Sequence, residues 1–236
     1  MKKRQIFFFI FVMTSVVLIS AFAHKQNKNR KIIALKIQYV QDAPLFLNDS
    51  LVNKLLIQKA GYKQDQLKDE LDLSMLESWI EKHPAVAETE VFTYPDGKIE
   101  MRIQEREPFL KIENEKSFFL DRNGVSFSIP SPMIDSLPKV QGSISESEFI
   151  SLVQIIETLQ EDPFIRQNRI EIIKHETGYS MALSNLPFII EMGQVDNLSI
   201  KINKLKAYQA YLISQKEPLL PKRINLAFKG QVVTSN

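Results

Sequence analysis

Hydrophobic and polar positions divide the chain into an apolar segment and two longer mixed segments. Residues 6–23 form an unbroken apolar run without a charged side chain, and basic residues precede and follow it. As a helix this run rises about 27 Å, close to the roughly 30 Å thickness of a bilayer's hydrocarbon core. We therefore predict a transmembrane anchor over residues 6–23, with a short tail over residues 1–5 before it and a juxtamembrane linker over residues 24–31 after it.

A second interpretation of the same run is a cleaved signal peptide. Ala21, Phe22 and Ala23 match the small-x-small pattern of a cleavage site after Ala23. The length of the run favours the anchor, whereas basic residues on both sides leave its orientation open. Both interpretations place the rest of the chain outside the cytoplasm.

Residues 32–108 carry the pattern of a small α+β unit. Apolar residues alternate over 32–40, recur at helical spacing in two segments, and then alternate on both sides of the turn sequence Tyr94-Pro95-Asp96-Gly97. The predicted elements are a strand over 32–40, a helix from the caps at 48–50 to Gly61, a helix from a Ser74-x-x-Glu77 capping box to Pro84, and strands over 89–94 and 98–105.

From Phe109 onward the pattern is mainly that of strands. The predicted elements are a hairpin around Asn123-Gly124, a helix capped by Ser145-x-x-Glu148, strands over 170–173, 179–183 and 188–191, a helix over 198–212, and a closing strand over 222–233. Pro130 and Pro132 fall in a predicted loop, and Pro163 ends or kinks the first helix. We predict an α+β protein whose residues 109–236 form a mainly antiparallel β domain with helices.

The closing segment is predicted as one strand. Its residues alternate between a core face with Ile224, Leu226 and Phe228 and an opposite face with Asn225, Ala227 and Lys229. As an edge strand it would present unpaired backbone groups, with which a strand from a partner can pair. A strand in the interior of the sheet is the alternative.

Charge and composition narrow the class of protein. The chain has 236 residues, with 30 Lys and Arg against 28 Asp and Glu, and it is 44% hydrophobic. The hydrophobic content indicates a folded chain. Basic and acidic residues are nearly equal in number, which argues against a nucleic-acid partner, because nucleic-acid-binding proteins usually have an excess of basic residues. Beyond the tail, 27 basic and 28 acidic residues remain, so the exported part is nearly neutral.

Catalytic and metal-binding motifs are missing from the sequence. The absence of cysteine excludes disulfides, thiolate zinc sites, iron–sulfur clusters and cysteine nucleophiles. The histidines, at positions 24, 83 and 175, lie far apart, and the dispersed glycines form no phosphate-binding loop or nucleophile elbow. We therefore expect no catalytic residue, cofactor, metal or small-molecule substrate.

Two acidic groupings have structural explanations. Asp121-x-Asn123-Gly124 resembles part of a calcium loop but lacks its other ligands, so a turn is preferred. Glu105 and Glu107 share a face if they lie in a strand, and we expect them to be surface charges and not a catalytic pair.

The order of short motifs along nearly the whole chain resembles the FtsQ/DivIB family of bacterial cell-division proteins, most closely its Bacteroidetes-type members. These motifs are IEKHPAV (80–86), YPDG (94–97), RIQEREP (102–108), FLDRNG (119–124), LPKVQG (137–142) and INLAFKGQVV (224–233). Each motif is weak alone, and their order together with the N-terminal apolar run carries the resemblance.

The resemblance implies a non-enzymatic scaffold of the division machinery at the septum. Its N-terminus would be cytoplasmic, and one helix would span the inner membrane in contact with the membrane lipid. A POTRA-like domain over 32–108 would help to recruit the protein to the septum, and a distal β domain would follow over 109–236. In this family the last strands of the distal domain hold the FtsB/FtsL coiled-coil pair, and other divisome membrane proteins are expected partners.

The family's closing motif gives the candidate partner-binding residues. They are Asn225, Ala227, Phe228, Lys229, Gly230, Gln231 and Val232. Two of them depart from the commoner pattern, because Asn225 stands where Asp is frequent and Ala227 where a larger residue is frequent. Which side chains anchor the partner is therefore left open.

Two other functions are compatible with parts of the sequence. A periplasmic soluble hydrolase or binding protein would follow from cleavage after Ala23. The POTRA module of an outer-membrane assembly factor would need a barrel of membrane strands of about ten residues each. The long amphipathic helix predicted after Ser145 argues against that barrel.

Overall fold

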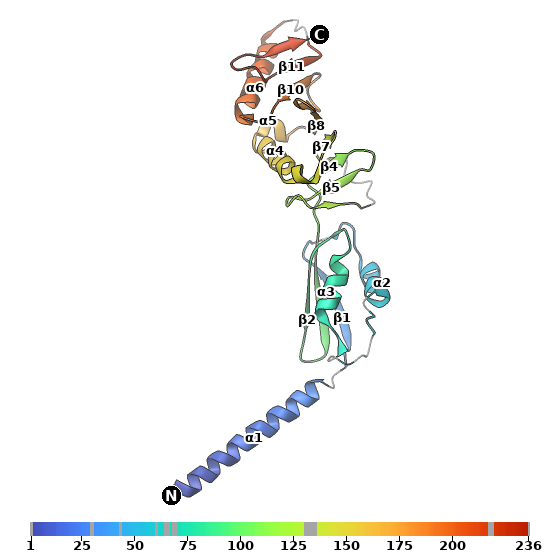
Figure 1. Cartoon of the computed structure of the whole chain (residues 1–236), viewed down its shortest axis with the longest axis vertical. Coiled ribbons are helices and arrows are strands. Elements are labelled where there is room, and N and C mark those ends of the chain that lie inside the picture. Colours follow the sequence, from blue (N-terminus) through green and yellow to red (C-terminus); the bar gives the residue numbers. More distant parts are fainter. Residues whose placement is uncertain are drawn as a thin grey trace. The chain divides into compact units, whose positions relative to one another are not determined.

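The computed structural model describes residues 2–28, 31–42, 44–59, 61–63, 67, 70–129, 136–216 and 220–235. The chain divides into two compact units, one that runs to Arg106 and includes the N-terminal helix, and one that begins at Glu107 (Figure 1).

Helix α1 (Lys2–Lys28) extends beyond both ends of the predicted apolar span. Its segment Arg4–Gln26 is long and apolar enough to cross a membrane, and none of its most apolar part is buried. The hydroxyl groups of Thr14 and Ser15 donate hydrogen bonds to carbonyl oxygens of the preceding turn. With these groups satisfied inside the helix, α1 is compatible with a hydrocarbon environment. Residues 29–30 of the predicted linker lie outside the described residues.

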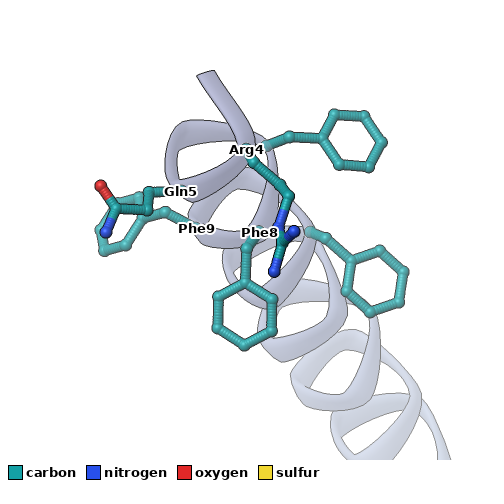
Figure 2. Close-up of a pocket in the computed structure, with 6 residues that line it drawn as sticks. Arg4, Gln5, Phe8 and Phe9 are labelled. Atoms are coloured by element: carbon teal, nitrogen blue, oxygen red, sulfur yellow. The ribbon is translucent and has the colours of Figure 1, made fainter. Parts of the chain in front are cut away.

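Aromatic side chains surround the first turns of α1. Figure 2 shows Phe8 and Phe9 pointing away from the helix axis, near Arg4 and Gln5. A shallow hollow of about 890 Å³ lies along these turns. The residues that line the hollow are Arg4, Gln5, Phe7, Phe8, Phe9 and Phe11. All of them belong to this one helix, so the hollow is a stretch of helix surface.

The rest of the first unit is a three-stranded sheet with two helices. Its elements are β1 (Ala34–Tyr39), α2 (Asp49–Lys59), α3 (Leu73–Glu81), β2 (Val86–Thr93) and β3 (Lys98–Glu105). The described strands lie in the order β1-β3-β2, with β1 parallel and β2 antiparallel to β3. Its core includes Leu56 of α2, Leu76 and Ile80 of α3, and Ile99, Met101 and Ile103 of the central strand.

The predicted capping box of α3 is wrong. The helix begins one residue before Ser74, and the Asp72 carboxylate accepts a hydrogen bond from the Met75 N–H at 3.0 Å. A carboxylate at this position satisfies a free N–H and complements the helix dipole. Glu77 instead accepts a hydrogen bond from the Val91 N–H in β2, at 2.8 Å.

Glu105 is the second correction in this unit, because it is buried and not a surface charge. Its side chain is only 1% exposed and accepts hydrogen bonds from three successive backbone N–H groups, those of residues 45–47. Alternation explains the burial, since Glu105 follows Met101 and Ile103 on the inward face of β3. Glu107 is exposed, as expected.

The second unit is one mixed sheet with helices. Its described strands lie in the order β12-β11-β10-β9-β8-β7-β4-β5-β6. Strands β4, β7 and β8 run parallel, as do β10 and β11, and the other neighbouring pairs are antiparallel. The strands are β4 (Leu110–Glu113), β5 (Phe118–Leu120), β6 (Ser126–Phe127), β7 (Lys139–Gln141), β8 (Ile170–His175), β9 (Gly178–Leu183), β10 (Ile189–Gly193), β11 (Arg223–Asn225) and β12 (Val233–Ser235). The α+β class is confirmed.

Helices supply the other half of this unit's core. They are a 3₁₀ turn η2 (Glu146–Glu148), α4 (Phe149–Glu161), α5 (Pro163–Arg166) and α6 (Leu198–Ser214). One buried residue from each of six adjacent strands lies in a continuous row, which consists of Ile112, Val140, Ile172, Met181, Ile190 and Ile224. These side chains share one core cluster with Ile156 of α4 and Leu205 of α6.

The local predictions for the start of this unit are largely confirmed. Ser145 and Glu148 form the predicted capping box. The Asp121 carboxylate accepts hydrogen bonds from the N–H groups of Asn123 and Val125, so this segment is a turn. Pro163 does not kink α4 but begins α5, which suits its missing N–H. Pro130 and Pro132 lie outside the described residues.

Candidate protein-interaction site

The predicted closing strand over residues 222–233 is wrong in its extent. The structure has two short antiparallel strands there, β11 and β12, joined by a turn. Ile224 and Leu226 are buried as predicted, but Phe228 is 49% exposed and lies in the turn.

Local chemistry explains why the chain reverses here. The Asn225 side-chain oxygen accepts a hydrogen bond from the Ala227 N–H at 2.9 Å, a contact typical of Asn at the start of a turn. Gly230 has a φ of 75°, in the left-handed region that glycine adopts without strain. Together they end β11 and redirect the backbone toward β12.

The reversal changes which strand forms the edge of the sheet. Strand β11 lies between β10 and β12, whereas β12 is the last strand in the described order. In the β11–β12 register, Asn225 lies opposite Val233, and Arg223 lies opposite Ser235. The predicted closing strand includes Val233 but stops before Thr234 and Ser235, and none of these three is among the predicted partner-binding residues. The β-branched pair Val233-Thr234 after Gly230 was the signal for them.

A lysine of α6 holds the turn between the two strands. The Lys204 ammonium donates hydrogen bonds to the carbonyl oxygens of Leu226 and Phe228, the second at 2.8 Å. Burial, with a smaller effect of the nearby Lys201 charge, lowers the pKa of Lys204. On the other side of the turn Gly193 lies so close to Ala227 that a Cβ on this glycine would be 2.9 Å from the Cβ of Ala227.

The predicted partner-binding residues thus have different surroundings. Asn225 lies in β11, where its amide also donates to Glu191 at 2.9 Å. Val232 precedes β12, is half-buried and packs against the core. The remaining predicted residues are exposed in the connecting turn, and they are Ala227, Phe228, Lys229, Gly230 and Gln231.

A polar depression of about 360 Å³ lies beside this site, next to β9, β10 and β11. Glu191 pairs there with Arg223 at 3.3 Å. His175 hydrogen-bonds with the Ser180 hydroxyl at 2.9 Å and so joins the two strands of a hairpin. Ser180 is only 4% exposed, so its hydroxyl is poorly placed to reach a substrate.

Within the described ranges, no group of three or more His, Asp or Glu side chains is placed to hold a metal ion. Five polar side chains of the depression bond to one another, in the pairs His175–Ser180, Glu191–Arg223 and Glu191–Asn225. The turn and the edge strand are exposed, and an exposed strand edge is suited to binding another chain.

Comparison with known families identifies the second unit. The family model described as "FtsQ/DivIB, C-terminal related" matches residues 107–235, which spans this unit almost from end to end. A comparison with curated proteins gave no match. The family match indicates a role in cell division. The match together with the apolar helix α1 indicates a single-pass membrane protein. Because the match covers more than half of the chain, the protein belongs to the FtsQ/DivIB C-terminal-related family.

Proposed function

We propose that the protein is a non-enzymatic scaffold of the bacterial division machinery at the septum. In this proposal α1 anchors the chain in the inner membrane with the N-terminus in the cytoplasm and both folded units in the periplasm. Family membership and the exposed apolar helix support it.

The proposed partner is an FtsB/FtsL-type coiled-coil pair, captured by strand addition to β12. The observation that carries the proposal is the position of β12, which has a neighbouring strand on one side only in the described sheet. Backbone pairing with such an edge supplies affinity, and side chains at alternate positions supply specificity. Other divisome membrane proteins are proposed partners of the same scaffold.

The turn before β12 supplies the side chains that would recognise the partner. Phe228 offers a half-exposed ring, and the residues from Lys229 to Gln231 are exposed beside it. On the sheet face, Val233 and Ser235 lie next to Asn225 and Arg223 in register. A partner strand on β12 would place its own side chains beside these four residues.

The first unit is proposed to act as a POTRA-like recruitment domain. Its element order of strand, two helices and two strands, with a mixed three-stranded sheet, supports this assignment.

Proline substitution at the two ends of the large sheet tests the proposal. Thr234→Pro removes a backbone N–H from β12, and Ser126→Pro makes the same change in β6, the strand at the opposite end of the sheet. The full chain in detergent is used to capture the purified FtsB/FtsL-type pair. We expect Thr234→Pro to lose capture and Ser126→Pro to retain it. Normal capture by a folded Thr234→Pro protein would contradict the proposal.

A further inference from the structure

Strand β2 of the first unit is an edge strand with a long exposed rim. It has eight residues and pairs with β3 on one side only in the described sheet. An edge of this length is a template for pairing with another chain, and proteins commonly protect such edges. The question is what protects this one.

Two glutamates of α3 bond to backbone N–H groups of β2. The Glu77 carboxylate accepts from the Val91 N–H at 2.8 Å, and the Glu81 carboxylate accepts from the Thr89 N–H at 3.2 Å. Helix α3 and strand β2 lie side by side (Figure 1). The carboxylates therefore occupy the positions that the carbonyl oxygens of an added strand would need.

The spacing of the two elements makes this double contact possible. Residues four apart on a helix are separated by about 6 Å along its axis. Residues two apart on a strand are separated by about 6.8 Å. The spacing of the two glutamates therefore matches that of the two strand residues. Glu77 lies at the Val91 N–H and Glu81 lies at the Thr89 N–H.

The side chains of the two strand residues point away from the edge. Thr89 is 5% exposed and Val91 is 7% exposed, so both face the core and leave only backbone groups at the rim. The neighbouring Glu90 lies on the opposite face and pairs with Arg102 at 3.4 Å. The α3 glutamates therefore bind backbone N–H groups of the edge, whereas Glu90 of β2 binds a side chain on the face of the sheet.

We propose that Glu77 and Glu81 guard the β2 edge and prevent it from pairing with β2 of a second copy of this chain. Antiparallel pairing of one strand with its own copy forms a closed two-fold dimer. The β-branched residues Thr89, Val91 and Thr93 give β2 the composition of a stable strand partner. With both carboxylates bound, the Thr89 and Val91 N–H groups in the middle of this edge are already occupied.

Removal of both carboxylates tests the guard. In Glu77→Ala/Glu81→Ala, amide hydrogen exchange at Thr89 and Val91 should be about tenfold faster or more, because each loses a charge-assisted bond. Sedimentation of the full chain in detergent micelles should show a larger dimer fraction than in the wild type. Glu77→Gln/Glu81→Gln keeps an oxygen acceptor at each position but loses the charge, so both measurements should lie between those of the alanine variant and the wild type.

A matched control removes two negative charges from the same region. Glu88→Ala/Glu90→Ala changes β2 side chains that are not bonded to the edge amides, so it should alter neither their exchange nor the dimer fraction. If the double α3 variant fails to fold, Glu81→Ala alone should accelerate exchange at Thr89 and leave Val91 protected. The proposal would be wrong if the Glu77→Ala/Glu81→Ala protein showed unchanged amide exchange at Thr89 and Val91. It would also be wrong if exchange became faster but the dimer fraction did not increase.

Discussion

Glu105 shows how one residue organises a long-range contact. A strand position that sequence alternation assigns to the inward face carries a carboxylate, and three backbone N–H groups of residues 45–47 satisfy it there. A buried carboxylate is stable only when its hydrogen bonds are supplied in this way. The segment before α2 is therefore fixed to the end of β3 by one side chain.

We predict that Glu105→Gln lowers the free energy of unfolding of the first unit by about 2–3 kcal/mol. The amide has one acceptor oxygen and no charge, and its NH₂ group faces N–H donors. Trp79 is the only tryptophan and lies in α3, so urea denaturation followed by its fluorescence reports on this unit. Glu107→Gln, at the exposed neighbouring position, should leave the transition unchanged. An equal effect of the two substitutions would show that the buried contact is not stabilising.

At this scale the sequence predicted the direction of side chains better than their partners. The period-two pattern placed Ile99, Met101 and Ile103 correctly in the core. The partners of Glu105 lie about 60 residues away in the sequence, and the partner of Glu77 lies on the next strand. Neither could be predicted, because both contacts depend on how the elements pack.

Among the elements, the start of α4 is fixed to the end of β8 by an ion pair. The Lys174 ammonium lies 2.6 Å from the Glu148 carboxylate and also donates to the Ser143 carbonyl. Lys174, together with hydrogen bonds from Ser145, lowers the pKa of Glu148 to about 2. This contact joins the capping box to the sheet.

The lowered pKa of Glu148 predicts a pH-dependent stability. Its pKa is lower when folded than the usual 4.5, so its stabilising effect is complete above about pH 5 and is lost as pH falls toward 2. Lys174→Met should therefore reduce the loss of second-unit stability between pH 5 and 2. Urea denaturation followed by circular dichroism measures this, with Trp79 fluorescence marking the first unit. Lys116→Met, at an exposed position, is the control and should keep the wild-type pH dependence. If Lys174→Met lost as much stability as the wild type between pH 5 and 2, the Lys174–Glu148 contact would not be the cause of the pH dependence.

The β11–β12 hairpin depends on α6 through Lys204. We predict that Lys204→Met frees the carbonyl oxygens of Leu226 and Phe228 and accelerates amide exchange over Val233–Ser235 by about tenfold. Lys206→Met is the matched control, because Lys206 on the same helix binds Asp162 at 2.8 Å instead. Similar exchange in both variants would mean that Lys204 does not position the edge strand.

The hairpin also shows where prediction from the sequence ended for the candidate site. Alternation over 224–228 is typical of one continuous strand, and it correctly placed Ile224 and Leu226 in the core. The turn itself is local, because Asn225 accepts a hydrogen bond from the Ala227 N–H and Gly230 has a positive φ. Its position against the sheet and α6 depends on contacts of Asn225 with Glu191 and of Lys204 with the turn carbonyls, which join distant segments. The sequence therefore indicated the site's region but assigned the edge to the wrong strand.

The whole molecule combines an apolar helix with two units that each present a strand edge. In the first unit two carboxylates occupy the β2 edge, whereas β12 of the second unit ends its sheet beside an exposed turn. Backbone edges recognise a partner strand without a large charged surface, which suits the nearly even charge balance of the chain. We therefore propose that the β12 edge captures the partner.

Amide hydrogen exchange of the full chain in nanodiscs, with and without the purified FtsB/FtsL-type pair, tests this assignment most directly. We predict that binding slows exchange at Val233–Ser235 by at least about tenfold, because a partner strand occupies the β12 rim. The amides of β6 at the opposite end of the sheet should not change. Binding of the pair with no added protection over Val233–Ser235 would contradict strand addition at β12.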